Sequence, residues 1–112
     1  MKNFRTFEQA KQELKELQEY IDLIENYQPE NLTQIVVFSY TLFGNTKETA
    51  TFLNNQNYSI DGRPFEANDI SDLITSPPAK NDLLHKKIKS LYLKKKRANH
   101  KTVITYNPYQ YH

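Results

Sequence analysis

Residues 44–74 constrain the fold more than any other stretch, because they have the pattern of two short helices joined by a turn. Gly44 and Asn45 interrupt an apolar run, and Asn45 is a good N-cap for a helix over 46–55. A second amphipathic segment follows over 66–75. Two short helices joined in this way are typical of a helix-turn-helix, an arrangement that most often binds DNA.

The same segment carries a family resemblance in the order of its residues. The matching residues are Ala50, Leu53-Asn54, Gly62-Arg63-Pro64-Phe65, Ile70 and Leu73-Ile74. This order resembles the helix-turn-helix in the DNA-binding regions of serine recombinases. The resemblance implies that 66–75 is the recognition helix. The chain departs from the family by placing Glu66, Asp69 and Asp72 there, and it is too short for a recombinase catalytic domain.

A nearly apolar segment precedes this pair and predicts a helix over 32–43. Its apolar residues spread almost all round the helix, which is typical of a helix at the centre of a core. With 46–55 and 66–75 it forms a three-helix helix-turn-helix core. Two glycines in 112 residues also favour helices. We therefore expect an all-α fold.

The N-terminal segment predicts a long amphipathic helix that begins with a Thr6–Gln9 capping box. Its apolar residues recur at alternating intervals of three and four, as in the seam of a coiled coil. They are Phe7, Ala10, Leu14, Leu17, Ile21 and Ile24. Two interpretations stay open: a coiled-coil homodimer through Phe7, Leu14, Leu17, Ile21 and Ile24, or a helix that folds back on its own domain.

The connection between the two short helices is longer than in a tight helix-turn-helix. Ile60-Asp61-Gly62-Arg63 predicts a turn within it. This turn could form a small hairpin or a loop that reaches a sugar-phosphate backbone. Arg63 would then contact phosphate, or it would be an ordinary exposed turn residue.

The C-terminal part predicts a basic helix from Lys80 to about Asn99, with Ser76 as a candidate cap. Its inner stripe consists of Leu83, Leu84, Ile88, Leu91 and Tyr92. The four consecutive basic residues Lys94–Arg97 exceed what a helix dipole requires and favour nucleic-acid phosphate. The segment 102–106 has strand propensity and could pair with 58–61 as a short β wing, whereas 107–112 is expected to be frayed.

The charge is divided unevenly along the chain. Residues 1–82 carry seven Lys or Arg against thirteen Asp or Glu, whereas residues 83–112 carry eight basic residues and no acidic one. We therefore expect one small domain in three parts: a helix over 1–28, a helix-turn-helix domain with its basic helix over 29–101, and a tail over 102–112. The absence of cysteine, of a signal peptide and of a long apolar run favours the cytoplasm and no membrane.

The sequence carries no pattern expected of an enzyme. His85, His100 and His112 share no metal-ligand spacing, and there is no cysteine to join them. No glycine-rich phosphate loop or nucleophile elbow is present. We expect no catalytic residue, no metal site and no cofactor.

These patterns predict a small protein that binds double-stranded DNA, as a transcriptional regulator or an accessory factor of a mobile element. The expected contacts to the DNA backbone are Arg63, Lys86, Lys87, Lys89, Lys94, Lys95, Lys96, Arg97 and Lys101. Asn68 and Ser71 are the expected contacts to base edges. The alternative is a protein-interaction module on a helix-turn-helix scaffold, which would bind another regulator through its acidic face at residues 66, 69 and 72.

Overall fold

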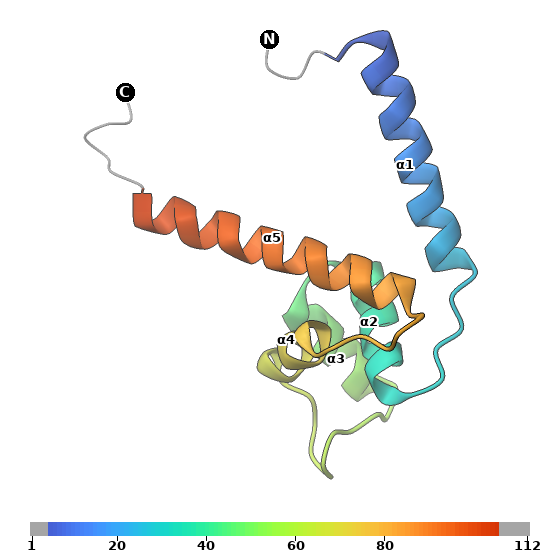
Figure 1. The fold of residues 1–112 in the computed structure, drawn as a ribbon. Helices are drawn as coiled ribbons and strands as arrows, with labels where there is room; N and C mark the ends of the chain where they lie inside the picture. Colours follow the sequence, from blue (N-terminus) through green and yellow to red (C-terminus); the bar gives the residue numbers. More distant parts are fainter. Residues whose placement is uncertain (1–4, 106–112) are drawn as a thin grey trace.

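The computed structural model describes the backbone of residues 5–105 and the side chains of residues 5–97. All regular secondary structure in this part of the chain is helical, as the all-α prediction requires (Figure 1). The helices are α1 (Phe7–Glu25), α2 (Leu32–Phe43), α3 (Thr46–Asn55), α4 (Ala67–Thr75) and α5 (Leu83–Thr105).

The helix boundaries follow local capping signals. Thr6 and Gln9 form the predicted capping box at the start of α1. Gly44 ends α2 in the left-handed region with a φ of 66°, a conformation that glycine adopts without strain. The Asn45 side chain then accepts a hydrogen bond of 3.0 Å from the Glu48 N–H and caps α3. The predicted bounds of α2 and α3 are therefore confirmed.

Helices α2, α3 and α4 pack against one another, and α5 lies across α2 and α4. The buried apolar residues come from these four helices and the connection before α4. They are Val36, Val37, Tyr40, Ala50, Leu53, Phe65, Ile70, Ile74, Leu84 and Ile88. The nearly apolar helix α2 thus lies in the core, as its composition predicts.

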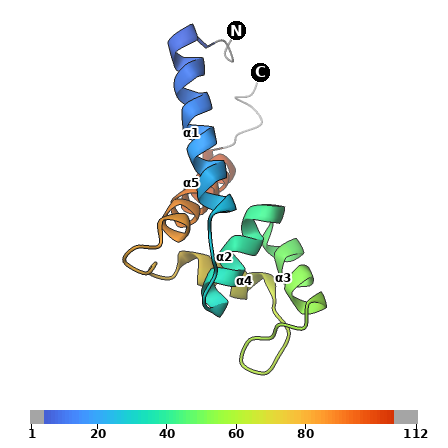
Figure 2. The same cartoon turned by 90° about the vertical axis from the view of Figure 1, so that its right-hand side faces the viewer.

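Helix α1 stands away from this body as an arm in both ribbon views (Figures 1 and 2). No residue of α1 is buried, and only its C-terminal end, with Tyr20, Leu23 and Ile24, packs against the core. The last turns of α5 also extend beyond the body (Figure 1). The molecule therefore consists of a four-helix body from which α1 and the end of α5 project.

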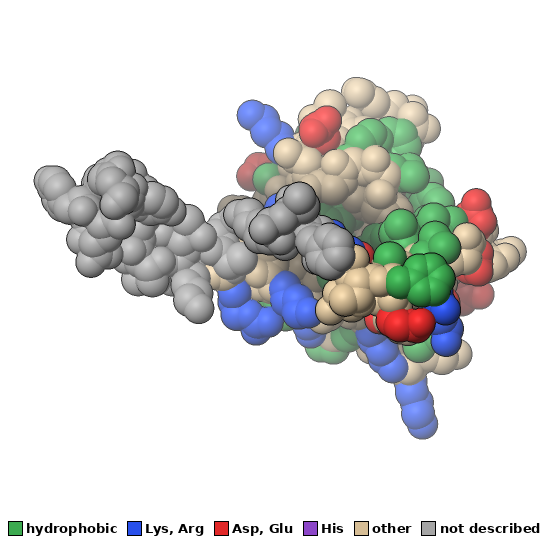
Figure 3. All heavy atoms as spheres, turned by 90° about the horizontal axis from the view of Figure 1, so that it is seen from above, with side chains coloured by type: hydrophobic (Ala, Val, Ile, Leu, Met, Phe, Trp, Pro, Cys, Tyr) green, Lys and Arg blue, Asp and Glu red, His purple; other side chains and the backbone are tan. Residues whose placement is uncertain are grey.

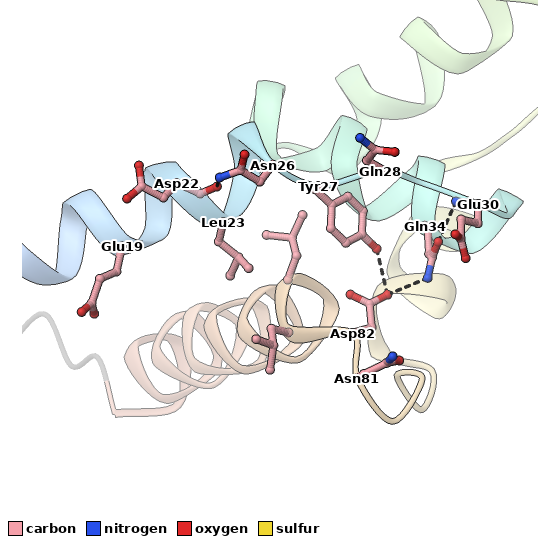
Figure 4. A pocket seen from close by; sticks show the side chains of 12 residues that line it. Glu19, Asp22, Leu23, Asn26, Tyr27, Gln28, Glu30, Gln34, Asn81 and Asp82 are labelled. Carbon is pink, nitrogen blue, oxygen red and sulfur yellow. Dashed lines mark hydrogen bonds between the residues drawn. The ribbon is translucent and has the colours of Figure 1, made fainter.

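A buried carboxylate joins α5 to the segment that links α1 and α2 (Figure 4). Asp82 is 5% exposed, and its Oδ2 accepts hydrogen bonds from the Tyr27 hydroxyl at 2.8 Å and the Gln34 amide at 3.0 Å. Its Oδ1 accepts a hydrogen bond from the His85 N–H at 2.9 Å, so Asp82 also caps α5. Burial and the bond to Asp82 raise the pKa of Tyr27 well above its usual value.

His85 forms a second polar contact beneath α5. Its side chain is 2% exposed, and Nε2 lies 2.9 Å from the backbone carbonyl oxygen of Ile74 at the end of α4. The histidine therefore serves packing between α4 and α5. The sequence prediction that His85 belongs to no metal site is consistent with this role but is not tested by it.

The connection from α3 to α4 contains the predicted turn. Ile60 and Arg63 exchange two backbone hydrogen bonds of 2.8 and 3.0 Å, and Asp61 and Gly62 between them have φ values of 51° and 77°. Positive φ at both central positions is the geometry of a tight hairpin turn. Asn54 fastens the loop to α3, because its amide pairs with both backbone polar groups of Phe65.

Two predictions about the C-terminal part are wrong. Residues 102–105 continue α5 instead of forming a strand, and 58–61 pairs only within its own turn, so the described residues form no β wing. No proline or glycine interrupts the chain between Leu83 and Thr105, and β-branched residues oppose a helix only weakly. The second wrong prediction is that Ser76 caps the basic helix: Ser76 ends α4, and Asp82 is the residue that caps α5. Tyr106 and 107–112 lie outside the described residues.

Candidate nucleic-acid interface

Helix α5 presents one apolar face to the core and a basic face to solvent. Leu84 and Ile88 are buried, and Tyr92 continues their stripe one turn later. The Tyr92 ring lies edge-on to Tyr40 of α2 at a centroid distance of 5.9 Å, and its hydroxyl lies 2.7 Å from the Ser71 hydroxyl of α4. These contacts fix the rotation of α5 and therefore the direction in which its lysines point.

The basic cluster, which we define as Lys94, Lys95, Lys96 and Arg97, follows directly after this anchored turn. All four side chains are exposed, and none forms an ion pair with a described residue. Lys95 Nζ donates a hydrogen bond of 3.3 Å to the Gly44 carbonyl oxygen at the junction of α2 and α3. Lys95 therefore lies beside the junction of α2 and α3, a proximity that sequence spacing does not predict.

A hollow of about 240 Å³ opens between the basic cluster and the start of α3. Its lining residues are Tyr40, Gly44, Asn45, Thr46, Tyr92, Lys95 and Lys96. Lys and Arg side chains gather beside the grey end of α5 in the space-filling view (Figure 3). Helix α5 has no acidic residue to neutralise them, so this side of the molecule favours an anionic partner.

The other predicted backbone contacts have different surroundings. Lys86 and Lys87 are exposed on the first turns of α5, and Lys89 is half-buried. Lys86 Nζ donates a hydrogen bond of 2.6 Å to the Lys80 carbonyl oxygen. The side chain of Lys101 lies outside the described residues. Lys87 is thus as exposed as the residues of the basic cluster, whereas Lys86 is bonded to the backbone.

Arg63 forms an ion pair with a residue of α4. Its two terminal nitrogens each lie 2.8 Å from a carboxylate oxygen of Asp69 in a bidentate pair. Asp69 also accepts a hydrogen bond from the Glu66 N–H at 2.8 Å at the start of α4. The bonds from Arg63 and the Glu66 backbone lower the pKa of Asp69 from 3.8 to about 2. Arg63 therefore fastens the turn to α4, and its terminal nitrogens are occupied by Asp69.

We expect this pair to give a defined dependence of stability on pH. A carboxylate with a lowered pKa stabilises the fold above its unfolded value of 3.8, and the stabilisation is lost as the pH falls toward 2. Asp69→Asn should therefore lower the urea midpoint at neutral pH. The difference between the midpoints measured at pH 4 and at pH 2 should also be smaller than in the natural chain. Arg63→Gln should do the same. Asp72→Asn, an exposed carboxylate on the same helix, is the matched control, and an equal effect there would contradict the assignment.

The two residues predicted to read bases are not equivalent. Asn68 is exposed on the second residue of α4, where it is accessible to a partner. Ser71 faces α5, because its hydroxyl pairs with Tyr92. The prediction that Ser71 contacts a base edge is therefore not supported by its position. The signal that was missed is the phenol of Tyr92, which needs a polar partner when it packs against a core.

The predicted dimerisation residues form an exposed stripe on α1. Phe7, Leu14, Leu17 and Ile21 are 74%, 68%, 56% and 39% exposed. Ile24 differs, because it packs against the core and is half-buried. The alternative of a helix that folds back on its domain therefore holds only for the last turns of α1. We call the four exposed residues the α1 stripe.

A second hollow, of about 550 Å³, lies between the end of α1 and the start of α5 (Figure 4). Its acidic lining residues are Glu19, Asp22, Glu30 and Asp82, and it contains no Lys or Arg. The Asp82 carboxylate is already satisfied by its three hydrogen bonds. Among the described residues, no group of three His, Cys, Asp or Glu side chains could hold a metal ion.

Comparison of the chain with protein-family models, curated proteins and solved structures finds no match. The resemblance of residues 44–75 to serine recombinases accordingly stays a prediction. No helix within residues 5–105 is both long and apolar enough to cross a membrane.

Proposed function

We propose that this chain is a small DNA-binding protein in which the basic cluster contacts phosphate. The observation that carries the proposal is the position of that cluster. Four exposed cations occupy consecutive positions of a helix that has no acidic residue, and two of them, Lys95 and Lys96, line a hollow with the start of α3. A dense group of exposed cations on the surface of a small domain favours the phosphates of a duplex backbone.

The three packed helices would act as a helix-turn-helix in this proposal. Helix α4 would be the recognition helix, and its exposed Asn68 is suited to an adenine edge. The exposed carboxylates of Glu66 and Asp72 oppose phosphate, so α4 would approach the bases while α5 supplies the attraction. A role as transcriptional regulator or as accessory factor of a mobile element follows from the resemblance described above.

The alternative of a protein-interaction module through the acidic face of α4 has less support. Its three carboxylates were Glu66, Asp69 and Asp72. Asp69 is paired with Arg63 and its side chain is 12% exposed. Only the carboxylates of Glu66 and Asp72 are left on that surface to bind a partner. The basic cluster has four exposed charges and is therefore the stronger candidate for a charged interface.

A salt titration tests the proposal. Fluorescence anisotropy of a random-sequence duplex should show binding at low salt, with log K falling linearly against log salt. Neutralisation of three to four phosphates predicts a slope of about −3 to −4. Absence of binding at low salt would overturn the proposal. Tighter binding to an RNA hairpin or a single strand of equal length would redirect it to RNA or to single strands.

A further inference from the structure

The α1 stripe has no partner within the described chain. Its four apolar side chains are exposed, and the first turns of the helix that carries them stand away from the body (Figure 1). Helices of this length in water depend on packing of their apolar face more than on propensity. The heptad spacing of the stripe is the pattern that two helices need to interdigitate. A partner helix with the same spacing is therefore the occupant that fits it.

We propose that the α1 stripe binds the α1 stripe of a second copy of this chain, with the two helices antiparallel. The charge of α1 is the first reason. Residues 7–15 carry Glu8 and Glu13 against Lys11 and Lys15, whereas residues 16–25 carry four acidic residues and no basic one. An antiparallel pair places each acidic half beside the half that carries both lysines. A parallel pair would gather all eight of these carboxylates at one end of the dimer, which electrostatic repulsion opposes at low salt.

The sizes of the seam residues give the second reason. In antiparallel packing the layers pair Leu14 with Leu17 of the second copy and Ala10 with Ile21 of the second copy. The small Ala10 then leaves room for the larger Ile21. In a parallel pair Ala10 would face Ala10 and leave a gap in the middle of a short seam.

The position of the body gives the third reason. Only the C-terminal end of α1 joins the body. Parallel helices would bring both bodies to the same end. Antiparallel helices separate them by the length of α1, about 28 Å for nineteen residues at 1.5 Å per residue. Phe7 then reaches the end of the seam beside the half-buried Ile24 of the second copy.

Sedimentation of the full chain without DNA tests whether the dimer exists. We expect a concentration-dependent dimer, and Leu14→Glu with Leu17→Glu should raise its dissociation constant by roughly 100-fold or more, because both layers at the centre would bury charge. Both residues are exposed in the monomer, so circular dichroism should show an intact body. Leu42→Glu, at a residue of α2 that is 56% exposed, is the matched control and should leave the dimer unchanged.

Single cysteines test the orientation, since the natural chain has none. A mixture of Ala10→Cys and Ile21→Cys chains should form a disulfide between the two variants, whereas neither variant should cross-link with itself. In the antiparallel pair two copies of position 21 lie about 16 Å apart along the axis, beyond disulfide reach. Self-linkage of Ile21→Cys would overturn the orientation, and a monomer at all concentrations would overturn the dimer. Neither result bears on DNA binding.

Discussion

Removal of two cations from the basic cluster is expected to lower the affinity for duplex DNA about 50-fold at 0.1 M salt. Each phosphate contact contributes about 0.9 to the slope of log K against log salt. Between 1 M and 0.1 M salt, two contacts therefore raise the binding constant by nearly two orders of magnitude. Lys94→Ala with Arg97→Ala is the variant of choice. Both side chains are exposed and form no ion pair with a described residue. The fold should be unaffected, and the slope should decrease by about 2.

Lys95 is left intact in this variant, because its bond to the Gly44 carbonyl oxygen contributes to the junction of α2 and α3. The matched control is Lys80→Glu. It lowers the net charge by the same two units at one exposed residue outside α5 and outside α1. Anisotropy titrations of both variants against one duplex should separate a local contact from an effect of net charge. Equal losses in the two variants would show that the basic cluster is not the contact surface.

The parts of the fold that sequence predicts well are those determined over a few residues. The bounds of α2 and α3 depend on Asn31, Gly44 and Asn45. The two asparagines each accept a hydrogen bond from the backbone N–H three residues later, and Gly44 supplies the left-handed φ that ends α2. The turn at 60–63 depends on two central residues that tolerate positive φ. Such signals are local, and tertiary packing does not oppose them here.

The parts that sequence misses depend on contacts between distant residues. Asp82 bonds Tyr27 and Gln34, which lie 55 and 48 residues away, and no pattern in the sequence joins them. The pairing of Ser71 with Tyr92 likewise turned an expected base contact into a contact between helices. Arg63 was expected either to contact phosphate from an extended loop or to be an ordinary exposed turn residue, whereas the geometry of the turn brings it to Asp69. The run of four basic residues predicted the basic cluster, but only the fold shows that Lys95 and Lys96 lie beside the start of α3.

Loss of the Asp82 carboxylate is the stability change that we expect to be largest among the polar residues. Asp82→Ala leaves the Tyr27 hydroxyl and the Gln34 amide without their acceptor in a part-buried site, and it removes the N-cap of α5. Each unsatisfied group costs about 1–3 kcal/mol and the cap about 1 kcal/mol. The free energy of unfolding should fall by about 3 kcal/mol or more, measured by urea denaturation.

Two variants separate the carboxylate from its neighbours. Tyr27→Phe removes one hydrogen bond but keeps the ring, which stacks on Phe38 at a centroid distance of 6.2 Å, so a loss of about 1 kcal/mol is expected. Asp72→Ala removes an exposed carboxylate from α4 and should change stability by less than about 0.5 kcal/mol. A loss for Asp82→Ala as small as that for Asp72→Ala would contradict a structural role for the buried carboxylate.

Asp82→Ala should also loosen α1 relative to the body before the body unfolds. The bonds from Tyr27 and Gln34 flank the segment that links α1 to α2, and α1 packs against the core only through its last turns. Hydrogen exchange should therefore accelerate in residues 20–34 more than in the buried turns of α3 and α4. Uniform acceleration through all helices would instead mean that Asp82 stabilises the fold as a whole and does not position the arm. The direction of α1 determines where the two four-helix bodies lie in the proposed dimer. Faster exchange confined to residues 20–34 would therefore mean that the buried Asp82 carboxylate sets the arrangement of the two copies.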